Sequence, residues 1–228
     1  MTSSVVVAVL AVPALLAVTA GCVLLMRAFA RVKLLPEELA LAVAWVFMVG
    51  GLVWLGVYLT ESTLFGFGAP WSWLAAAHFA AAGFGALTVT ALCCRVVSDP
   101  RALWILRTLL VVHPVAYLVA AGGIMGFRYS DEISAVAYEV IFVTQLAAVA
   151  FGRPDRMARG PRAVLFLALC VPVATLVPAL AWAFQRPIFH LEAMIRYHGL
   201  VNAIGHVGLG LTALLWGRPP SHAAMKAP

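Results

Sequence analysis

A chain of 228 residues in which 64% of the side chains are hydrophobic and 11% are charged cannot hide its apolar stretches in one aqueous core. Its mean hydropathy of +1.02 is typical of a polytopic membrane protein and excludes an ordinary soluble domain. The formal net charge of +6 is explained by basic loops beside anionic lipid, so it does not indicate a nucleic-acid-binding surface.

Seven apolar runs are each long enough to cross about 30 Å of hydrocarbon. They cover residues 5–26, 39–59, 71–92, 103–124, 133–152, 163–184 and 191–216. The connections between them are rich in proline and glycine, and each is too short to hold a second domain. Because a membrane-spanning backbone must satisfy its own hydrogen bonds, we expect an all-α integral membrane protein, with residues 1–228 forming a single bundle of seven transmembrane helices.

The loop cations gather on one side of this predicted bundle. That side carries Arg27, Arg31, Lys33, Arg95, Arg101, Arg153, Arg156, Arg159, Arg162, Arg218 and Lys226, whereas the other side carries Arg128 and Arg186. The positive-inside rule then predicts that the N-terminus lies outside and the C-terminus in the cytoplasm. We expect a multi-pass protein of a bacterial cytoplasmic (inner) membrane. The first run is not read as a cleaved signal peptide, because its cations follow the apolar residues instead of preceding them.

Three ionisable residues fall at one common depth in these helices. His78, Glu139 and His198 each lie about seven residues inward from the predicted outer end of a different helix, or about 10 Å below the surface at ~1.5 Å per residue. An ionisable side chain in hydrocarbon is costly unless it pairs or faces a cavity. The common depth therefore predicts a functional site, which the side chains would line in the outer half of the bundle.

The last helix has a polar face. Its polar side chains share about 160° of arc and are expected to point into the bundle: Glu192, Arg196, His198, Asn202 and His206. A purely structural alternative is that Glu192 and Arg196 form an i,i+4 ion pair near the interface while the others bridge helices by hydrogen bonds. We leave both interpretations open for Arg196 and favour a functional role for the His198 and Asn202 pair.

Other helices supply further candidates for the site. Glu61 ends the second helix and is either a catalytic acid or a solvated loop residue. His113 precedes Pro114, and a histidine in that position is more often a hydrogen-bond partner at a helix kink than a catalyst. Aromatic residues at similar depth, which serve equally as packing or interface anchors, are Phe79, Tyr138, Phe142, Trp182 and Tyr197.

Two segments carry a resemblance to a known family. Residues 78–84, His-Phe-Ala-Ala-Ala-Gly-Phe, and residues 198–205, His-Gly-Leu-Val-Asn-Ala-Ile-Gly, resemble the paired HFxxAGF and HGxxNAxG signatures of YndJ-like bacterial membrane proteins. The resemblance implies that His78, His198 and Asn202 belong together, and it carries over no activity. The chain differs from the family pattern at His206, where an aromatic residue is expected. A weaker resemblance, in size, topology and membrane carboxylates but without aligned motifs, is to the small seven-helix membrane terpene cyclases.

The residues at the common depth suit acid–base chemistry. Apolar surroundings favour the neutral form of a carboxyl group, so Glu139 would stay protonated and deliver a proton to an epoxide, alkene or acetal oxygen. His198 or His78 would accept a proton, and Asn202 would orient a hydroxyl or carbonyl group. Glu61 and Glu192 are the alternative acids. The expected substrate-binding residues, whose aromatic members could shield a cationic intermediate, are Arg196, His113, Tyr138, Phe142, Tyr197 and Trp182.

Three classes of function fit this pattern. We favour an intramembrane cyclase or isomerase that takes a lipophilic polyketide, isoprenoid or lipid from the bilayer and requires no organic or metal cofactor. An intramembrane metal-dependent hydrolase is a second class, although the chain contains no HExxH or HxxxH pair. A proton-coupled transporter is the third, although the number of helices is odd and the sequence contains no inverted repeat. The substrate, the choice between reaction and transport, and the oligomeric state are left open by the sequence.

Overall fold

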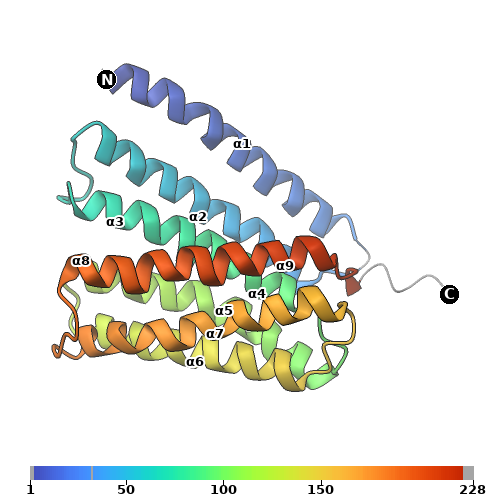
Figure 1. The fold of residues 1–228 in the computed structure, drawn as a ribbon. Helices are drawn as coiled ribbons and strands as arrows, with labels where there is room; N and C mark the ends of the chain where they lie inside the picture. The colour runs from blue at the N-terminus through green and yellow to red at the C-terminus, as the bar shows by residue number, and fades with distance from the viewer. Residues whose placement is uncertain (1–2, 32, 223–228) are drawn as a thin grey trace. The chain divides into compact units, whose positions relative to one another are not determined.

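The computed structural model describes residues 3–31 and 33–222, without the side chain of Ile124, and no strand is assigned among them (Figure 1). Seven helices in this part of the chain are long and apolar enough to cross a membrane. They span Ser3–Phe29, Pro36–Leu59, Trp71–Cys93, Pro100–Gly123, Ser130–Phe151, Arg159–Ala183 and Leu191–Gly217. The prediction of seven apolar helices is confirmed, whereas their orientation in a membrane remains a prediction.

Two of these seven helices are divided into shorter elements, and five are continuous. The first, second, fourth, fifth and sixth are α1 (Ser3–Phe29), α2 (Pro36–Leu59), α5 (Pro100–Ile124), α6 (Ser130–Phe151) and α7 (Arg159–Ala183). The third consists of α3 (Trp71–His78), the π-helix η1 (Phe79–Ala86) and α4 (Leu87–Cys93). The last consists of α8 (Leu191–Met194), the π-helices η2 (Ile195–Leu200) and η3 (Asn202–Gly208), and α9 (Leu209–Gly217).

Four helices begin three or four residues earlier than their apolar runs predicted, at Pro36, Pro100, Ser130 and Arg159, and two of these starts are prolines. Proline suits the first helical turn, where its missing N–H would have no intrahelical partner. At the second of these starts the side chain of Asp99 caps the helix, because its Oδ1 accepts hydrogen bonds of 2.9 Å from the backbone N–H groups of Arg101 and Ala102. Hydropathy alone misses such starts, since the first turn of a helix is polar.

The chain forms two compact units, Met1–Thr88 and Val89–Pro228, and each is described separately. In the first unit α2 packs against α1, α3 and η1. Glycine permits close packing there, since a Cβ on Gly83 would lie 2.8 Å from the Cβ of Phe47. The rings of Trp45 on α2 and Phe84 on η1 are also in contact, with centroids 4.8 Å apart. The arrangement of all seven helices in one bundle remains a prediction.

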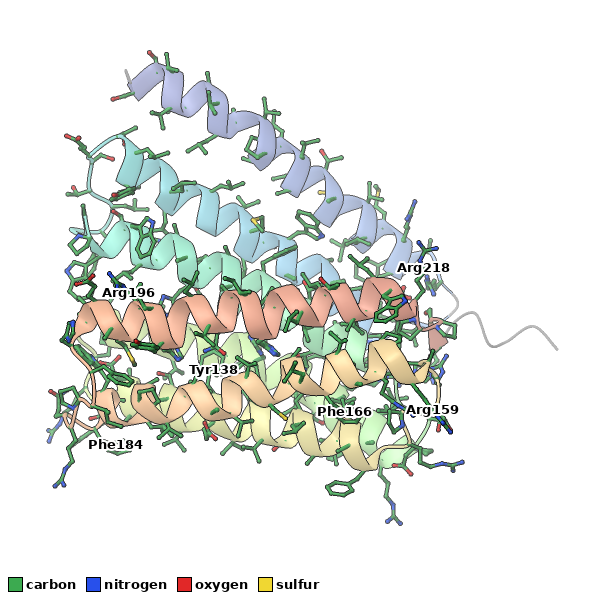
Figure 2. All side chains as sticks on the ribbon, viewed as in Figure 1. Tyr138, Arg159, Phe166, Phe184, Arg196 and Arg218 are labelled. Carbon is green, nitrogen blue, oxygen red and sulfur yellow. The ribbon has the colours of Figure 1, made fainter. Side chains whose placement is uncertain are left out.

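In the second unit α6 packs against α5 and α7, and α7 packs against η2, η3 and α9 (Figure 1). Figure 2 shows Arg159 and Arg218 at one end of this unit, Arg196 and Phe184 at the other, and Tyr138 between them. Lys226, which was predicted to lie on the same side as Arg218, is outside the described residues. Most of the candidate site residues belong to this unit.

Candidate functional site

The last helix is π-helical around His198, Asn202 and His206. His198 lies in η2, and Asn202 and His206 lie in η3. A π-helix pairs residues five apart, which widens each turn, and such segments are often found at functional sites. The widened turns carry most of the polar stripe that the sequence predicted. Within it, His198 and His206 form hydrogen bonds with carbonyl groups of α7, and Asn202 lies against His198.

His206 is held by a carbonyl group that a proline makes available. In a regular helix the carbonyl of Ala168 would accept from the N–H of residue 172, but this residue is Pro172 and has no N–H. The Nδ1 of His206 lies 3.1 Å from the Ala168 oxygen and donates to it. Because a carbonyl oxygen only accepts, the proton of the neutral ring is fixed on Nδ1, and Nε2 carries the lone pair.

His198 is also held by a carbonyl group of α7, two turns along the helix, although residue 179, the usual helical donor to that carbonyl, is an alanine. Its Nδ1 lies 3.0 Å from the carbonyl oxygen of Thr175 and donates to it. The amide Nδ2 of Asn202 is 3.3 Å from the same ring nitrogen. Since Nδ1–H is already a donor, rotating the Asn202 amide by 180° would place its oxygen to accept from it as well. The predicted pairing of His198 with Asn202 is therefore a direct contact within one helix.

A buried cluster of rings lies beside this stripe, and we call His113, Tyr138, Phe142 and His206 the ring cluster. Tyr138 and Phe142 are stacked, with centroids 5.9 Å apart. His113 meets them edge-on at 5.3 and 6.1 Å, and His206 meets Phe142 edge-on at 5.0 Å. All four side chains are at least nine-tenths buried. Tyr138 and Phe142, predicted to shield a substrate, thus pack against two histidines inside the unit.

Glu139 follows Tyr138 on α6 and is half-buried. Its Oε2 is shielded from solvent and has no hydrogen-bond partner among the described residues. The Asn202 amide also has one shielded atom without a partner there, Oδ1 as placed or Nδ2 after the 180° rotation. A buried polar atom without a partner is costly, and it marks a place where a ligand group or a proton would be stabilised.

The polar residues nearest the end of the last helix are more exposed. Arg196 donates a hydrogen bond to Glu192, and about two-thirds of each side chain is accessible. This is the i,i+4 ion pair that the structural interpretation predicted for them. Tyr197 is also exposed, with its ring 5.3 Å from that of Phe189, and Trp182 is 38% exposed.

Two candidates belong to the first unit. His78 is exposed, and its Nδ1 lies 2.9 Å from the carbonyl oxygen of Leu74, one turn earlier in α3. Glu61 is exposed just beyond α2 and lines a hollow of about 400 Å³ with Tyr58, Leu59 and Ala69. Their predicted convergence with Glu139, His198 and Asn202, which belong to the second unit, remains a prediction.

Comparison with known families identifies the chain. A model of the family described as YndJ-like protein matches residues 1–206, which include both the segment after His78 and the segment after His198. The chain belongs to the YndJ-like family. No curated protein and no solved structure matches it. The resemblance that the two motifs predicted is therefore confirmed.

Both signature segments of this YndJ-like chain coincide with π-helix. The first begins at His78, the residue before η1, and the second runs through η2 and η3. The two motifs thus share the wide turns of a π-helix, although they lie in different units. Neither hydropathy nor residue spacing predicted this feature. The matched region ends at His206, so the motif histidines lie within it and α9 follows it.

A buried polar group that the sequence interpretation missed lies elsewhere in the second unit. Gln145 on α6 is fully buried, and its Oε1 accepts from Thr90 over 3.2 Å while its Nε2 donates to the Cys93 sulfur over 3.6 Å. The only signal in the sequence was a lone glutamine in an apolar run. No group of three or more His, Cys, Asp and Glu residues in the described part of the chain is placed to hold a metal ion.

Proposed function

We propose that this YndJ-like protein is an intramembrane acid–base enzyme, a cyclase or isomerase that acts on a lipophilic substrate. The observation that carries the proposal is the anchoring of His198. Its Nδ1–H donates to the Thr175 carbonyl, and Asn202 adjoins the same nitrogen. This contact fixes the ring orientation and makes Nε2 the basic nitrogen, as a general base requires.

In the proposed reaction Glu139 is the general acid. Its shielded oxygen has no competing partner within the described residues, and its apolar neighbours favour the protonated carboxyl group. Proton transfer from Glu139 to an alkene, epoxide or acetal oxygen would start the reaction, and His198 would remove a proton from the resulting intermediate. Asn202 would orient an oxygen of the substrate through its amide. The exposed Glu192, paired with Arg196, is a weaker candidate for the acid.

The substrate is proposed to be a polyketide, an isoprenoid or another lipid that enters from the bilayer. The helices that carry Glu139 and His198 are apolar over membrane-spanning lengths, so a ligand reaching these residues laterally would itself have to be lipophilic. Aromatic side chains next to the acid, such as Tyr138 and Phe142, would stabilise positive charge through their π faces. The proposed chemistry uses side chains of the chain itself.

An isotope experiment tests the proposal even while the substrate is unidentified. The protein in lipid nanodiscs is incubated in D₂O with a total lipid extract of the source cells, and the lipids are compared by mass spectrometry. Protonation of an alkene transfers solvent-derived deuterium to carbon, whereas reaction at an epoxide or acetal oxygen gives a product with a different retention time. Wild-type protein should yield one of these changes, and Glu139→Gln should yield neither. Identical lipid profiles with both proteins would contradict the proposal.

A proton-coupled transporter is the second candidate, favoured by the continuation of the polar stripe to the buried His206. The ring cluster places His113, Tyr138 and His206 in one contiguous group, and chains of titratable residues inside a bundle are typical of proton pathways. Proteoliposomes containing a pH-sensitive dye distinguish the two functions. Substrate-dependent acidification would favour transport, and deuterium labelling without acidification would favour the enzyme.

A further inference from the structure

Two buried polar atoms in the ring cluster have complementary hydrogen-bonding needs. The hydroxyl of Tyr138 and the Nε2 of His206 are both shielded from solvent and have no hydrogen-bond partner within residues 3–31 and 33–222. The side chains are 9% and 2% exposed, respectively. Buried polar groups in proteins are nearly always paired, so two such atoms in one cluster require an explanation.

The two atoms belong to rings that contact the same side chain. Phe142 stacks on Tyr138 at 5.9 Å and meets His206 at 5.0 Å between ring centroids. The three residues come from α6 and η3, and all lie in the second unit. Both side chains therefore pack on one apolar ring, and His113, which meets Tyr138 and Phe142 edge-on, is the other polar member of the cluster.

The chemistry of the ligand follows from the hydrogen-bonding roles. The contact with Ala168 places the proton of His206 on Nδ1, so Nε2 can only accept. Tyr138 carries an O–H that can donate. A ligand that satisfies both must accept from Tyr138 and donate to His206. A carbonyl group cannot donate and an ammonium group cannot accept, whereas a hydroxyl group does both.

We infer that Tyr138 and His206 form a buried binding site for a hydroxyl group. The hydroxyl belongs either to an internal water molecule or to a lipophilic alcohol that enters from the bilayer. Internal waters typically bridge otherwise unpaired polar groups in this way. The site requires neither Glu139 nor turnover, so it can be tested independently of the proposed enzyme activity.

Tyr138→Phe gives a test in which the sign of the effect is decisive. If the hydroxyl of Tyr138 is bonded to a ligand, removing it loses a hydrogen bond, and the Tm of the protein in nanodiscs should fall by roughly 2–4 °C. If that hydroxyl is unpaired, its removal should leave the Tm unchanged or raise it. A Tm for Tyr138→Phe equal to or above that of wild type overturns the inference.

The environment of His206 is measured directly in the wild-type protein. Histidine labelled with ¹⁵N should give a His206 signal from an Nδ1–H ring whose Nε2 accepts a hydrogen bond. Tyr138→Phe should shift this signal, and Tyr129→Phe, which removes a hydroxyl from an exposed tyrosine of the same unit, should leave it unchanged. Because the wild-type spectrum needs no variant, it remains informative if Tyr138→Phe fails to fold. A non-bonded Nε2 in that spectrum overturns the inference.

Two further measurements identify the source of the hydroxyl group. Magnetisation transfer from water to the His206 ring supports an internal water. A rise in Tm with 1-decanol, absent with decane and absent in Tyr138→Phe, supports a lipophilic alcohol. If Tyr138→Phe lowers the Tm but the wild-type protein gives neither response, Tyr138 bonds directly to the histidine, and the inference of a ligand site is wrong.

Discussion

The carbonyl oxygen of Ala168 accepts a hydrogen bond of 3.1 Å from His206 because its usual helical donor, residue 172, is a proline. Pro172 thus leaves the Ala168 carbonyl free to join α7 to η3. The resulting hydrogen bond determines which nitrogen of His206 is basic. Ala168 and His206 are both buried, so neither group has access to water as a substitute partner.

This relationship predicts coupling between His206 and Pro172. His206→Leu should destabilise the protein by about 1–3 kcal/mol, because the buried Ala168 carbonyl loses its donor. Pro172→Ala restores an N–H at residue 172, so the same histidine substitution should cost less in that background, by at least about 0.5 kcal/mol. Unfolding equilibria of the four proteins in one detergent measure this difference.

Pro178→Ala is the matched control for this cycle. It also removes a proline from α7, but the carbonyl that it affects belongs to Ala174, whereas His198 and His206 donate to Thr175 and Ala168. We expect the cost of His206→Leu to be unchanged in the Pro178→Ala background. Equal coupling to both prolines would mean that helix straightening, and not the Ala168 carbonyl, explains the effect.

A second prediction concerns the exposed ion pair of Glu192 and Arg196. About two-thirds of each side chain is accessible, so water and salt screen the attraction, and Arg196→Ala should change the free energy of unfolding by less than about 1 kcal/mol. Unfolding measurements at low and high salt test this. A larger, salt-independent loss would indicate that Arg196 has another partner.

The sequence predicted the helices far better than the contacts between them. Run length and hydropathy are enough to identify seven spans, because an apolar run of about 20 residues has few other stable structures. The first turns at Pro36 and Pro100 were missed because they are polar. The π-helical turns were also missed, since a shift from i→i+4 to i→i+5 pairing leaves no regular signature in composition.

The candidate site was predictable only for contacts within one helix. A spacing of four residues indicated that His198 and Asn202 share a face, and they are in contact. The partners of His198 and His206 on α7 could not be derived from their own helix, because a backbone carbonyl can come from any neighbour. Only Pro172 gave a hint, since a proline inside a helix leaves the carbonyl four residues earlier without its donor.

A third prediction tests the orientation of the chain. Most loop cations fall on one side, so a reporter fused after Pro228, which lies outside the described residues, should report a cytoplasmic location. A reporter inserted between Gly66 and Gly68 should report an external one. Alkaline phosphatase and green fluorescent protein fusions give opposite signals on the two sides. Reversed signals would place Glu139 and His198 in the inner half of the membrane.

The last prediction concerns the acid. Glu139→Gln keeps the shape of the side chain and can still hydrogen-bond, but it has no transferable carboxyl proton. If Glu139 is the general acid, turnover in the deuterium experiment should fall by ~10²–10⁴-fold, while the yield and Tm of folded protein change little.

The matched control for the acid is Glu132→Gln, the same change two turns earlier on α6, in its first turn. This residue is also half-buried but lies near the helix end, and its substitution should leave turnover unchanged. A fold defect would instead lower turnover and Tm together, which separates chemistry from stability. Full turnover by a folded Glu139→Gln protein would exclude Glu139 as the acid and leave Glu61 and Glu192 as the remaining candidates, to be tested by the same substitution to glutamine.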